Sequence, residues 1–273
     1  MGEFRISYVP DGVIHLKPAW LPDSAAHHWA AHPEHLDSSG HLVASVGGLL
    51  VELGDRALLI DAGFGPHEIP ADPKNPLIGG VYGGQLLTSL AALGRTPEEI
   101  EAVAISHLHF DHIGWAWSPA PGGEHPAFHQ ASYLLTEPEW AHRDQAAAHG
   151  VTTTMLAALE PRVRLISQNE EIFPGVRVLL TPGHTPGHAA FVLTSGGQRL
   201  IAFGDALHSP IQVRYPHWSA APDQNPRISA SHRRRLLHAL QQPNTLGFGP
   251  HFADVVFGRV RRDASGLAWH PEP

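Results

Sequence analysis

Four short apolar segments of this sequence each run into a glycine- or proline-containing turn that carries histidine or aspartate. They are "EAVAIS" before "HLHFDHIG", "VRVLL" before "TPGHTPGH", "QRLIAF" before "GDALH", and "TLGF" before "GPHF". Short apolar runs bounded by such turns are typical of buried strands. Because binding sites in α/β proteins lie at strand ends, the four turns predict one shared polar site. A histidine-rich surface is the alternative, since 22 of the 273 residues are histidine.

The first of these turns holds four potential metal ligands within six residues. His107 and His109 are two residues apart directly after the strand, so their side chains can point the same way and converge on one ion. Asp111 and His112 follow where the chain must turn, and they are placed to bind a second ion. The segment therefore predicts part of a metal site with two ions.

A site for two ions needs further ligands, and the other three strand ends offer them. The candidates are His184, Asp205 and His251, one after each strand. The chain contains no cysteine, which excludes disulfides, thiolate catalysis and cysteine-based zinc sites. Any ion must then be held by imidazole and carboxylate groups.

The balance of charged residues bears on which kinds of molecule this chain could bind. The chain has 18 Lys and Arg against 26 Asp and Glu, a net charge of −8, which does not favour binding to nucleic acid. The one basic run, His232 to Arg235, is interpreted as the solvated face of a helix. We find no secretory signal and no apolar run of membrane-spanning length, so we expect a cytoplasmic protein that binds no membrane.

The order of predicted elements indicates one α/β domain over residues 1–273, in which residues 1–40 form a strand followed by an irregular arm. A hairpin is expected at Gly54-Asp55, and residues 70–84 are expected to be a loop. Helices are expected over 85–94, 136–149, 151–160 and 229–242, and capping boxes are expected at Thr96 with Glu99 and at Thr136 with Glu139. A C-terminal hairpin is expected around residues 263–266.

With these ligands in this order, the sequence resembles the metallo-β-lactamase superfamily, and "LLIDAGFG" matches an upstream strand and turn of that family. The resemblance implies a four-layer αβ/βα sandwich with two mixed sheets flanked by helices. It implies that one ion is bound by His107, His109 and His184, the other by Asp111, His112 and His251, with Asp205 bridging both. Asp61 would support the metal loop, although a lone aspartate after a strand is usually only a turn residue.

The resemblance also implies the chemistry. Two divalent ions, zinc first and iron, manganese or cobalt as alternatives, would lower the pKa of a shared water and supply a bridging hydroxide as nucleophile. The complete ligand set argues against true β-lactamases. The expected function is a hydrolase for a small ester or lactone, with phosphotriesters also possible. The alternatives are a glyoxalase-II-like thioesterase, a tailoring hydrolase of a biosynthetic pathway, or a metal-binding protein without catalysis.

One position separates branches of this family. Acyl-homoserine-lactone lactonases typically have a tyrosine three residues after the bridging aspartate, where this chain has His208. The pattern is closer to the methyl parathion hydrolase and lactonase-like branch. His208 could orient substrate or donate a proton to the leaving group, or only support a ligand. We expect Asp111, Asp205 and His208 to take part in catalysis.

Aromatic residues in loops near the strand ends are candidates for the walls of the site. An aromatic pocket would accept an apolar acyl or aryl group, although most aromatic side chains simply belong to the core. The candidates are Phe64, Tyr82, Trp115, Trp117, Trp218 and Phe252. The arm 12–40 and the loop 66–84 are candidate lids or contacts of a homodimer.

Overall fold

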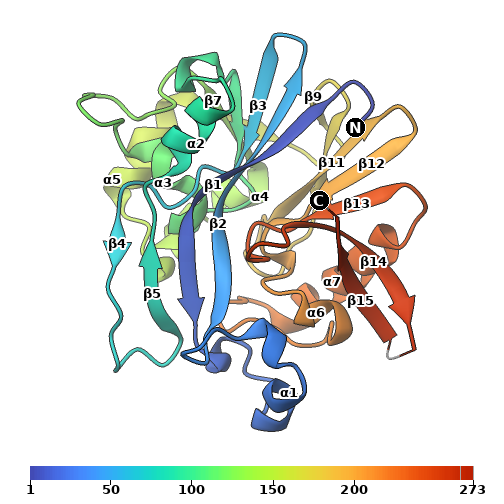
Figure 1. Cartoon of the computed structure of the whole chain (residues 1–273). Helices are drawn as coiled ribbons and strands as arrows, with labels where there is room; N and C mark the ends of the chain where they lie inside the picture. The colour runs from blue at the N-terminus through green and yellow to red at the C-terminus, as the bar shows by residue number, and fades with distance from the viewer. Residues whose placement is uncertain (265, 273) are drawn as a thin grey trace.

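The computed structural model describes residues 1–264 and 266–272, and in them two β-sheets pack face to face with helices on both outer sides (Figure 1). The first sheet has the strand order β4-β5-β1-β2-β3-β6-β7-β8. Its strands are β1 (Arg5–Leu16), β2 (Leu42–Leu53), β3 (Arg56–Ile60), β4 (Glu68–Ile69), β5 (Ile78–Tyr82), β6 (Ala102–Ala104), β7 (Ser132–Thr136) and β8 (Val163–Ile166).

The second sheet has the order β15-β14-β13-β12-β11-β10-β9. Its strands are β9 (Glu171–Phe173), β10 (Val176–Leu180), β11 (Ala189–Ser195), β12 (Gln198–Ala202), β13 (Thr245–Phe248), β14 (Phe257–Asp263) and β15 (Gly266–Pro271). Both sheets are mixed, because β3, β6, β7 and β8 run parallel, as do β12 and β13, while the remaining pairs are antiparallel. The predicted two mixed sheets are confirmed.

Seven α-helices occur in the described residues. They are α1 (Ala26–Ala31), α2 (Leu86–Ala92), α3 (Phe110–Trp117), α4 (Glu137–Ala141), α5 (Thr153–Leu159), α6 (Ile211–Arg214) and α7 (Pro226–Leu240). Short 3-10 turns are η1 (Pro18–Trp20), η2 (Pro33–His35), η3 (Pro97–Glu99), η4 (Arg143–His149), η5 (Glu160–Arg162) and η6 (Gly204–Ala206). No helix in the described part of the chain is long and apolar enough to cross a membrane.

The apolar residues explain the four layers. Along β2, Leu49 and Val51 are buried against the second sheet, while Leu50 between them is buried against α2 and α3. Successive side chains of a strand point to opposite faces, so a stretch with apolar residues at three successive positions is covered on both faces. On the second sheet, Ile201 of β12 packs against Leu237 of α7. The order helix, sheet, sheet, helix confirms the predicted αβ/βα sandwich.

Two expectations about local structure are corrected, and some strands were not predicted. Residues 70–84 are not only a loop, because Ile78–Tyr82 forms β5, which pairs with β1 and with β4. This strand was not predictable from its glycine-rich sequence, since its partners are remote in the chain. The predicted helix over 136–149 is α4 followed by the 3-10 turn η4, and β8 and β9 were not predicted. At the C-terminal hairpin the predicted strands are present, and Ser265 lies outside the described residues.

The basic run on α7 is also corrected. Arg234 and Arg235 are exposed, as expected for a solvated face, but Arg233 is 0% exposed. Its guanidinium donates hydrogen bonds to the carbonyl oxygens of Ala206 and Trp218 and forms an ion pair with Asp223. A charged group this deeply buried is found where it has partners, so Arg233 belongs to the interior of the second half of the molecule.

The predicted arm follows β1. It contains η1, α1 and η2, and it is held by Leu21 and Trp29, which are buried against Trp218 and neighbouring apolar residues. The carbonyl oxygen of Trp20 accepts a hydrogen bond from the N–H of Ala221, which connects the arm to the loop before α7. The arm therefore lies close to the strand ends that carry the predicted ligands.

Candidate metal centre

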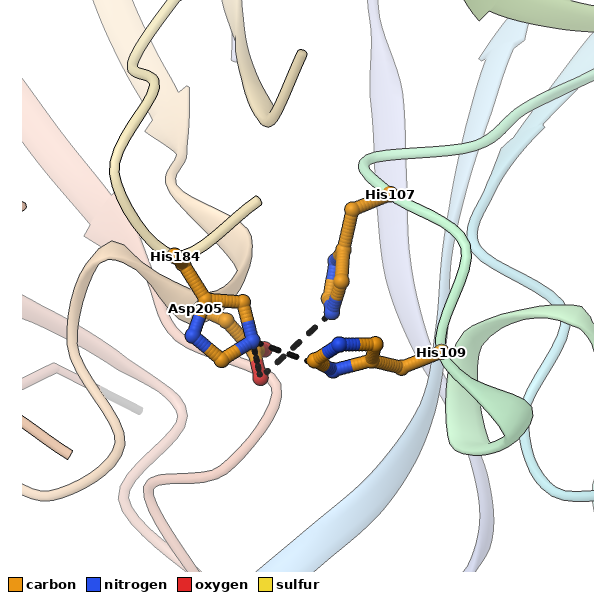
Figure 2. Close-up of side chains that lie close together, drawn as sticks. All are labelled: His107, His109, His184 and Asp205. Atoms are coloured by element: carbon orange, nitrogen blue, oxygen red, sulfur yellow. Dashed lines mark hydrogen bonds and ion pairs between the residues drawn. The ribbon is translucent and has the colours of Figure 1, made fainter. Parts of the chain in front are cut away.

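All seven predicted metal ligands lie at strand ends along one edge of the sandwich. His107 and His109 follow β6, and Asp111 and His112 lie in the first turn of α3. The other three ligands come from the second sheet: His184 from the loop after β10, Asp205 from η6 after β12, and His251 after β13. Figure 2 shows His107 and His109 on one loop facing His184 and Asp205 on the other side.

The seven side chains form two groups, each with its donor atoms within 4.8 Å of one another. One group is His107, His109, His184 and Asp205, and the other is Asp111, His112 and His251. All seven are buried. The division matches the two ligand groups that the family resemblance implies.

Asp205 faces both groups with different oxygen atoms. Its Oδ2 lies 3.2 Å from His184 Nε2 and 3.7 Å from His107 Nε2. Its Oδ1 lies 3.1 Å from His112 Nε2 and 3.0 Å from His251 Nε2. A carboxylate in this position can bind one ion through each oxygen, as the predicted bridging role requires.

The donor set fits divalent cations. His107 Nε2, His109 Nε2 and Asp205 Oδ1 are buried and have no hydrogen-bond partner among the described residues, and His184 Nε2 lies only 3.1 Å from His109 Nδ1. Buried polar atoms are rarely left unpaired, and several ring nitrogens aimed at one point are typical of a metal site. Nitrogen and oxygen donors without sulfur suit zinc and other first-row metals.

Burial and nearby charges set the protonation states of the histidines in the two ligand groups. Burial, followed by the neighbouring imidazoles, lowers the pKa of His107 and of His109 well below the ordinary value, so both rings are in the neutral form that binds metals. Burial also disfavours charge on His112, but the carboxylates of Asp205, Asp111 and Asp61 outweigh it and raise the pKa of that ring. The same negative charge attracts a divalent cation.

Each group is held in place by hydrogen bonds on the far side of its rings. His184 Nδ1 lies 2.8 Å from Asp223 Oδ1, and Asp223 Oδ2 accepts from Arg233. Burial would raise the pKa of Asp223, but His184 and Arg233 together lower it. Such outer partners fix the ring orientation of a ligand and are part of the design of metal sites. Asp223 and Arg233 were not predicted as site residues.

Asp61 has the supporting role that the resemblance implied. Its Oδ1 accepts the Ser106 N–H at 2.7 Å, and its Oδ2 lies 3.0 Å from His112 Nδ1. Its φ of 61° places it in the left-handed region, which the tight turn after β3 requires. On the other side of the second group, His251 Nδ1 lies 2.8 Å from the carbonyl oxygen of Ser45.

Glu139 corrects a predicted capping box. Thr136 does cap α4 through the Glu139 N–H, but the Glu139 carboxylate does not return to Thr136. It accepts the Leu108 N–H at 2.8 Å, the Gly187 N–H at 2.9 Å and the Thr185 hydroxyl at 2.7 Å. Glu139 thus clamps the His107–His109 loop to the loop of His184. The sequence pattern alone could not distinguish this clamp from a local cap.

His188 was also missed, although it ends the "TPGHTPGH" motif. Its Nε2 accepts the backbone N–H of Asp205 at 3.0 Å, and its Nδ1 lies 2.8 Å from Thr181 Oγ1. Burial lowers the pKa of His188 to about 3, so the ring is neutral and can accept that bond. The second histidine of the motif was the signal that could have identified it.

A cavity of about 630 Å³ opens onto both ligand groups. Asp205, His109, Asp111 and His251 form its floor. Its wall is mostly apolar and comes from β1, the arm, the β4–β5 hairpin, α3 and α5, with the lining residues Ile14, Leu16, Trp20, Phe64, Ile69, Leu77, Ile78, Phe110, Trp117 and Met155. The site can therefore hold a small molecule with an apolar part.

Only Phe64 and Trp117 of the six aromatic candidates line this cavity. The remaining four are corrected. Trp115 is buried in the core and donates its Nε1–H to Asp11, while Trp218 is buried in a stack on Tyr215. Phe252 is fully buried beside Phe203, and Tyr82 is 39% exposed on β5, outside the cavity lining. Trp115 lies on α3 and Tyr82 on β5, whereas Trp218 and Phe252 belong to irregular segments and their side chains pack into the core.

His208 lies in the cavity floor. Its Nε2 is 3.1 Å from Asp205 Oδ2, and neither ring nitrogen forms a well-aligned hydrogen bond with any residue in the described part of the chain. The Gln212 side chain accepts the His208 N–H and donates to the carbonyl oxygen of Trp218, which fixes this segment. Burial lowers the pKa of His208, so a neutral ring faces the cavity.

Known proteins match this chain in sequence and in fold. The model of the metallo-beta-lactamase superfamily matches residues 48–251. An N-acyl homoserine lactonase of Bacillus cereus is 27% identical over 164 residues, which cover 56% of this chain and 59% of the relative, less than two thirds of its length. An N-acyl homoserine lactonase of Bacillus thuringiensis is 25% identical over 215 residues, which cover 74% of this chain and 79% of the relative.

Solved structures match over the whole chain. One is AidC, a dizinc quorum-quenching lactonase in complex with a product, with a TM-score of 0.83, 24% identity and coverage of 100% and 96% of the two chains. Another is AbOPH, a hydrolase of the beta-lactamase superfamily, with a TM-score of 0.81, 22% identity and the same coverage. At a sequence identity below 25%, these two matches show that the fold is shared. Together with the family match over residues 48–251, the shared fold leads to one conclusion: the chain belongs to the metallo-β-lactamase superfamily.

Proposed function

We propose that this chain hydrolyses a small lactone that carries an apolar acyl chain, with the related carboxylic esters as poorer substrates. The observation that carries the proposal is the cavity of about 630 Å³, whose floor is the ligand cluster and whose wall is apolar. A polar reacting group and an apolar chain in one small molecule match that division. The names of the Bacillus relatives, N-acyl homoserine lactonases, support the lactone as the reacting group.

The ligands define the chemistry at the floor. His107, His109 and His184 would hold one ion, Asp111, His112 and His251 the other, and Asp205 would contact both. Two divalent ions, zinc in our proposal, would supply hydroxide near neutral pH and neutralise the charge that develops on the carbonyl oxygen. AidC, which has the same fold, is a dizinc enzyme, and this supports zinc.

His208 is proposed to bind the substrate's ester group. Its ring lies in the floor with both nitrogens free of other hydrogen bonds, 3.1 Å from Asp205. A ring nitrogen that carries hydrogen can donate to the acyl oxygen or to the leaving oxygen and so orient the group for attack. The loop that carries it is held by Gln212, so little motion is needed for this contact.

The wall is proposed to bind the acyl chain. Leu16, Ile69 and Met155 present aliphatic side chains from three different elements. Burial of each methylene group contributes about 0.8 kcal/mol, so a chain of several carbons would bind appreciably without any specific polar contact. A phosphotriester or a polar thioester would use this wall less well.

The test is a substrate screen of the zinc-loaded enzyme. Lactones with short and long acyl chains, aryl esters, thioesters and phosphotriesters are compared by kcat/KM, with chelator-treated enzyme as the control. The expected result is the highest kcat/KM for lactones, rising with acyl length. A higher value for thioesters or phosphotriesters, or equal values for short and long lactones, would contradict the proposal.

A further inference from the structure

The N-terminal arm is rich in histidines that have no part in the metal centre. Six of the 22 histidines lie between residues 15 and 41, namely His15, His27, His28, His32, His35 and His41. Two of them, His15 and His41, meet Asp37, and the three donor atoms lie within 4.8 Å of one another. This is the same closeness that the two ligand groups of the metal centre show.

The Asp37 carboxylate is fixed by the backbone and directed at His15. Its Oδ1 accepts the N–H groups of Ser39 at 2.8 Å and of His41 at 3.0 Å. Its Oδ2 lies 3.2 Å from His15 Nδ1. Oδ1 therefore stabilises the turn that carries His41, and Oδ2 is available to bind an ion. The side chains of His15 and Asp37 are 31% and 23% exposed, so the cluster is partly shielded from water.

His41 is held against the first sheet by a close approach to β5. A Cβ atom on Gly79 would lie 2.8 Å from His41 Cε1 and 3.0 Å from its Nδ1. A Cβ atom at position 79 would press on the ring, so glycine at this position lets the ring lie close to β5. The cluster therefore joins three segments: β1 through His15, the arm through Asp37, and the residue just before β2 through His41.

We propose that His15, Asp37 and His41 form a third metal site, which binds a divalent transition-metal ion such as zinc and fastens the arm to the first sheet. Two imidazoles and one carboxylate are a common protein donor set for zinc, with a further position left for water. An ion there would link residues 22 positions apart in the chain, His15 and Asp37. The arm also carries Trp20, which lines the catalytic cavity and contacts His208 with ring centroids 5.8 Å apart.

A second histidine cluster on the arm serves as the comparison. His32, Glu34 and His35 also bring donor atoms within 4.8 Å, but Glu34 is 61% exposed and all three lie within one short segment. An ion bound there would have to order exposed side chains at an entropic cost and would fasten nothing to the sheet. We therefore assign the site to the first cluster.

Zinc binding tests the assignment. The metal-depleted full chain is dialysed to equilibrium against free Zn²⁺, and bound zinc per chain is measured by mass spectrometry for the wild type and for three variants. Asp37→Asn keeps an oxygen acceptor for the Ser39 and His41 N–H groups, and His41→Gln removes the second imidazole. His35→Gln is the matched control. Asp37→Asn and His41→Gln should each bind one zinc fewer than the wild type, and His35→Gln should bind the same number.

Two outcomes would overturn the site. One is an unchanged zinc count in Asp37→Asn and His41→Gln, and the other is a loss confined to His35→Gln. Limited proteolysis with thermolysin gives a second readout, since zinc should slow cleavage within residues 17–41 of the wild type and leave cleavage of Asp37→Asn unchanged. Equal protection of both chains would contradict the fastening role. Neither readout depends on turnover, so the result is independent of the proposed lactonase activity.

Discussion

The ligand cluster and the cavity wall above it are built from different parts of the fold. The ligands come from strand ends of both sheets, and the far side of each ring is hydrogen-bonded, as His184 is to Asp223 and His251 to Ser45. The wall comes from the arm, the β4–β5 hairpin and short helices, and its contacts are apolar. Metal chemistry requires exact positions, whereas an acyl chain requires only apolar area. Substitutions in the ligand cluster should therefore lower kcat, whereas substitutions in the wall should raise KM.

The largest effect is expected from Asp205→Asn. Asp205 is the residue that faces both ligand groups, and an amide removes the negative charge between them. We expect kcat/KM to fall by more than about 10³-fold for every substrate, because the variant loses the shared ligand of both ions. Activity and bound metal are measured together. Full activity in this variant would exclude the proposed two-metal mechanism.

Arg233→Met should destabilise the fold rather than change substrate preference. The variant leaves the Asp223 carboxylate buried without its cationic partner, which costs about 3–5 kcal/mol in comparable buried pairs. We expect the Tm to fall by roughly 10 °C. The matched control is Arg234→Met, because Arg234 is the exposed neighbour on the same helix. Equal melting temperatures for the two variants would show that the Arg233 pair does not hold the ligand side of the second sheet.

His208→Ala should lower kcat while both ions remain bound. His208 contacts Asp205 but is not a member of either ligand group. A residue that orients or protonates the reacting group typically contributes about 10²-fold, which is the loss we expect. The control is His238→Ala on the exposed face of α7. Undiminished turnover with intact metal content would remove His208 from the mechanism.

The smallest effect is expected at the wall. Ile69 lines the cavity and is 43% exposed, so Ile69→Asn should leave the fold intact. We expect KM for a long-chain lactone to rise about fivefold, with kcat and the short-chain KM unchanged, because about 1 kcal/mol of apolar contact is lost. Tyr82→Ser, outside the cavity lining, should change neither constant. A similar change for short and long chains would show that the wall does not select acyl length.

The comparison also explains what could be predicted from the sequence. His107 and Asp205 follow strands in short motifs, so local spacing was enough to propose them as candidate ligands. Glu139 and Arg233 are remote from the motifs, and their local patterns suggested a cap and a solvated face. Trp115 lies next to the metal motif, yet the turn of α3 directs it into the core toward Asp11. The roles of these three side chains depend on contacts with residues remote in the sequence, and the spacing of a local motif contains no information about such contacts.

The two sheets share each ligand group, and this has a consequence for how the protein loses its metals. Asp111 and His112 come from the first sheet and His251 from the second, while Glu139 ties a loop of one to a loop of the other. No fragment that contains one sheet alone could hold a complete set of donors. Bound metal would resist separation of the sheets, and its release during unfolding should coincide with the loss of contact between them. The colour change of a zinc indicator would then report the opening of the sandwich itself.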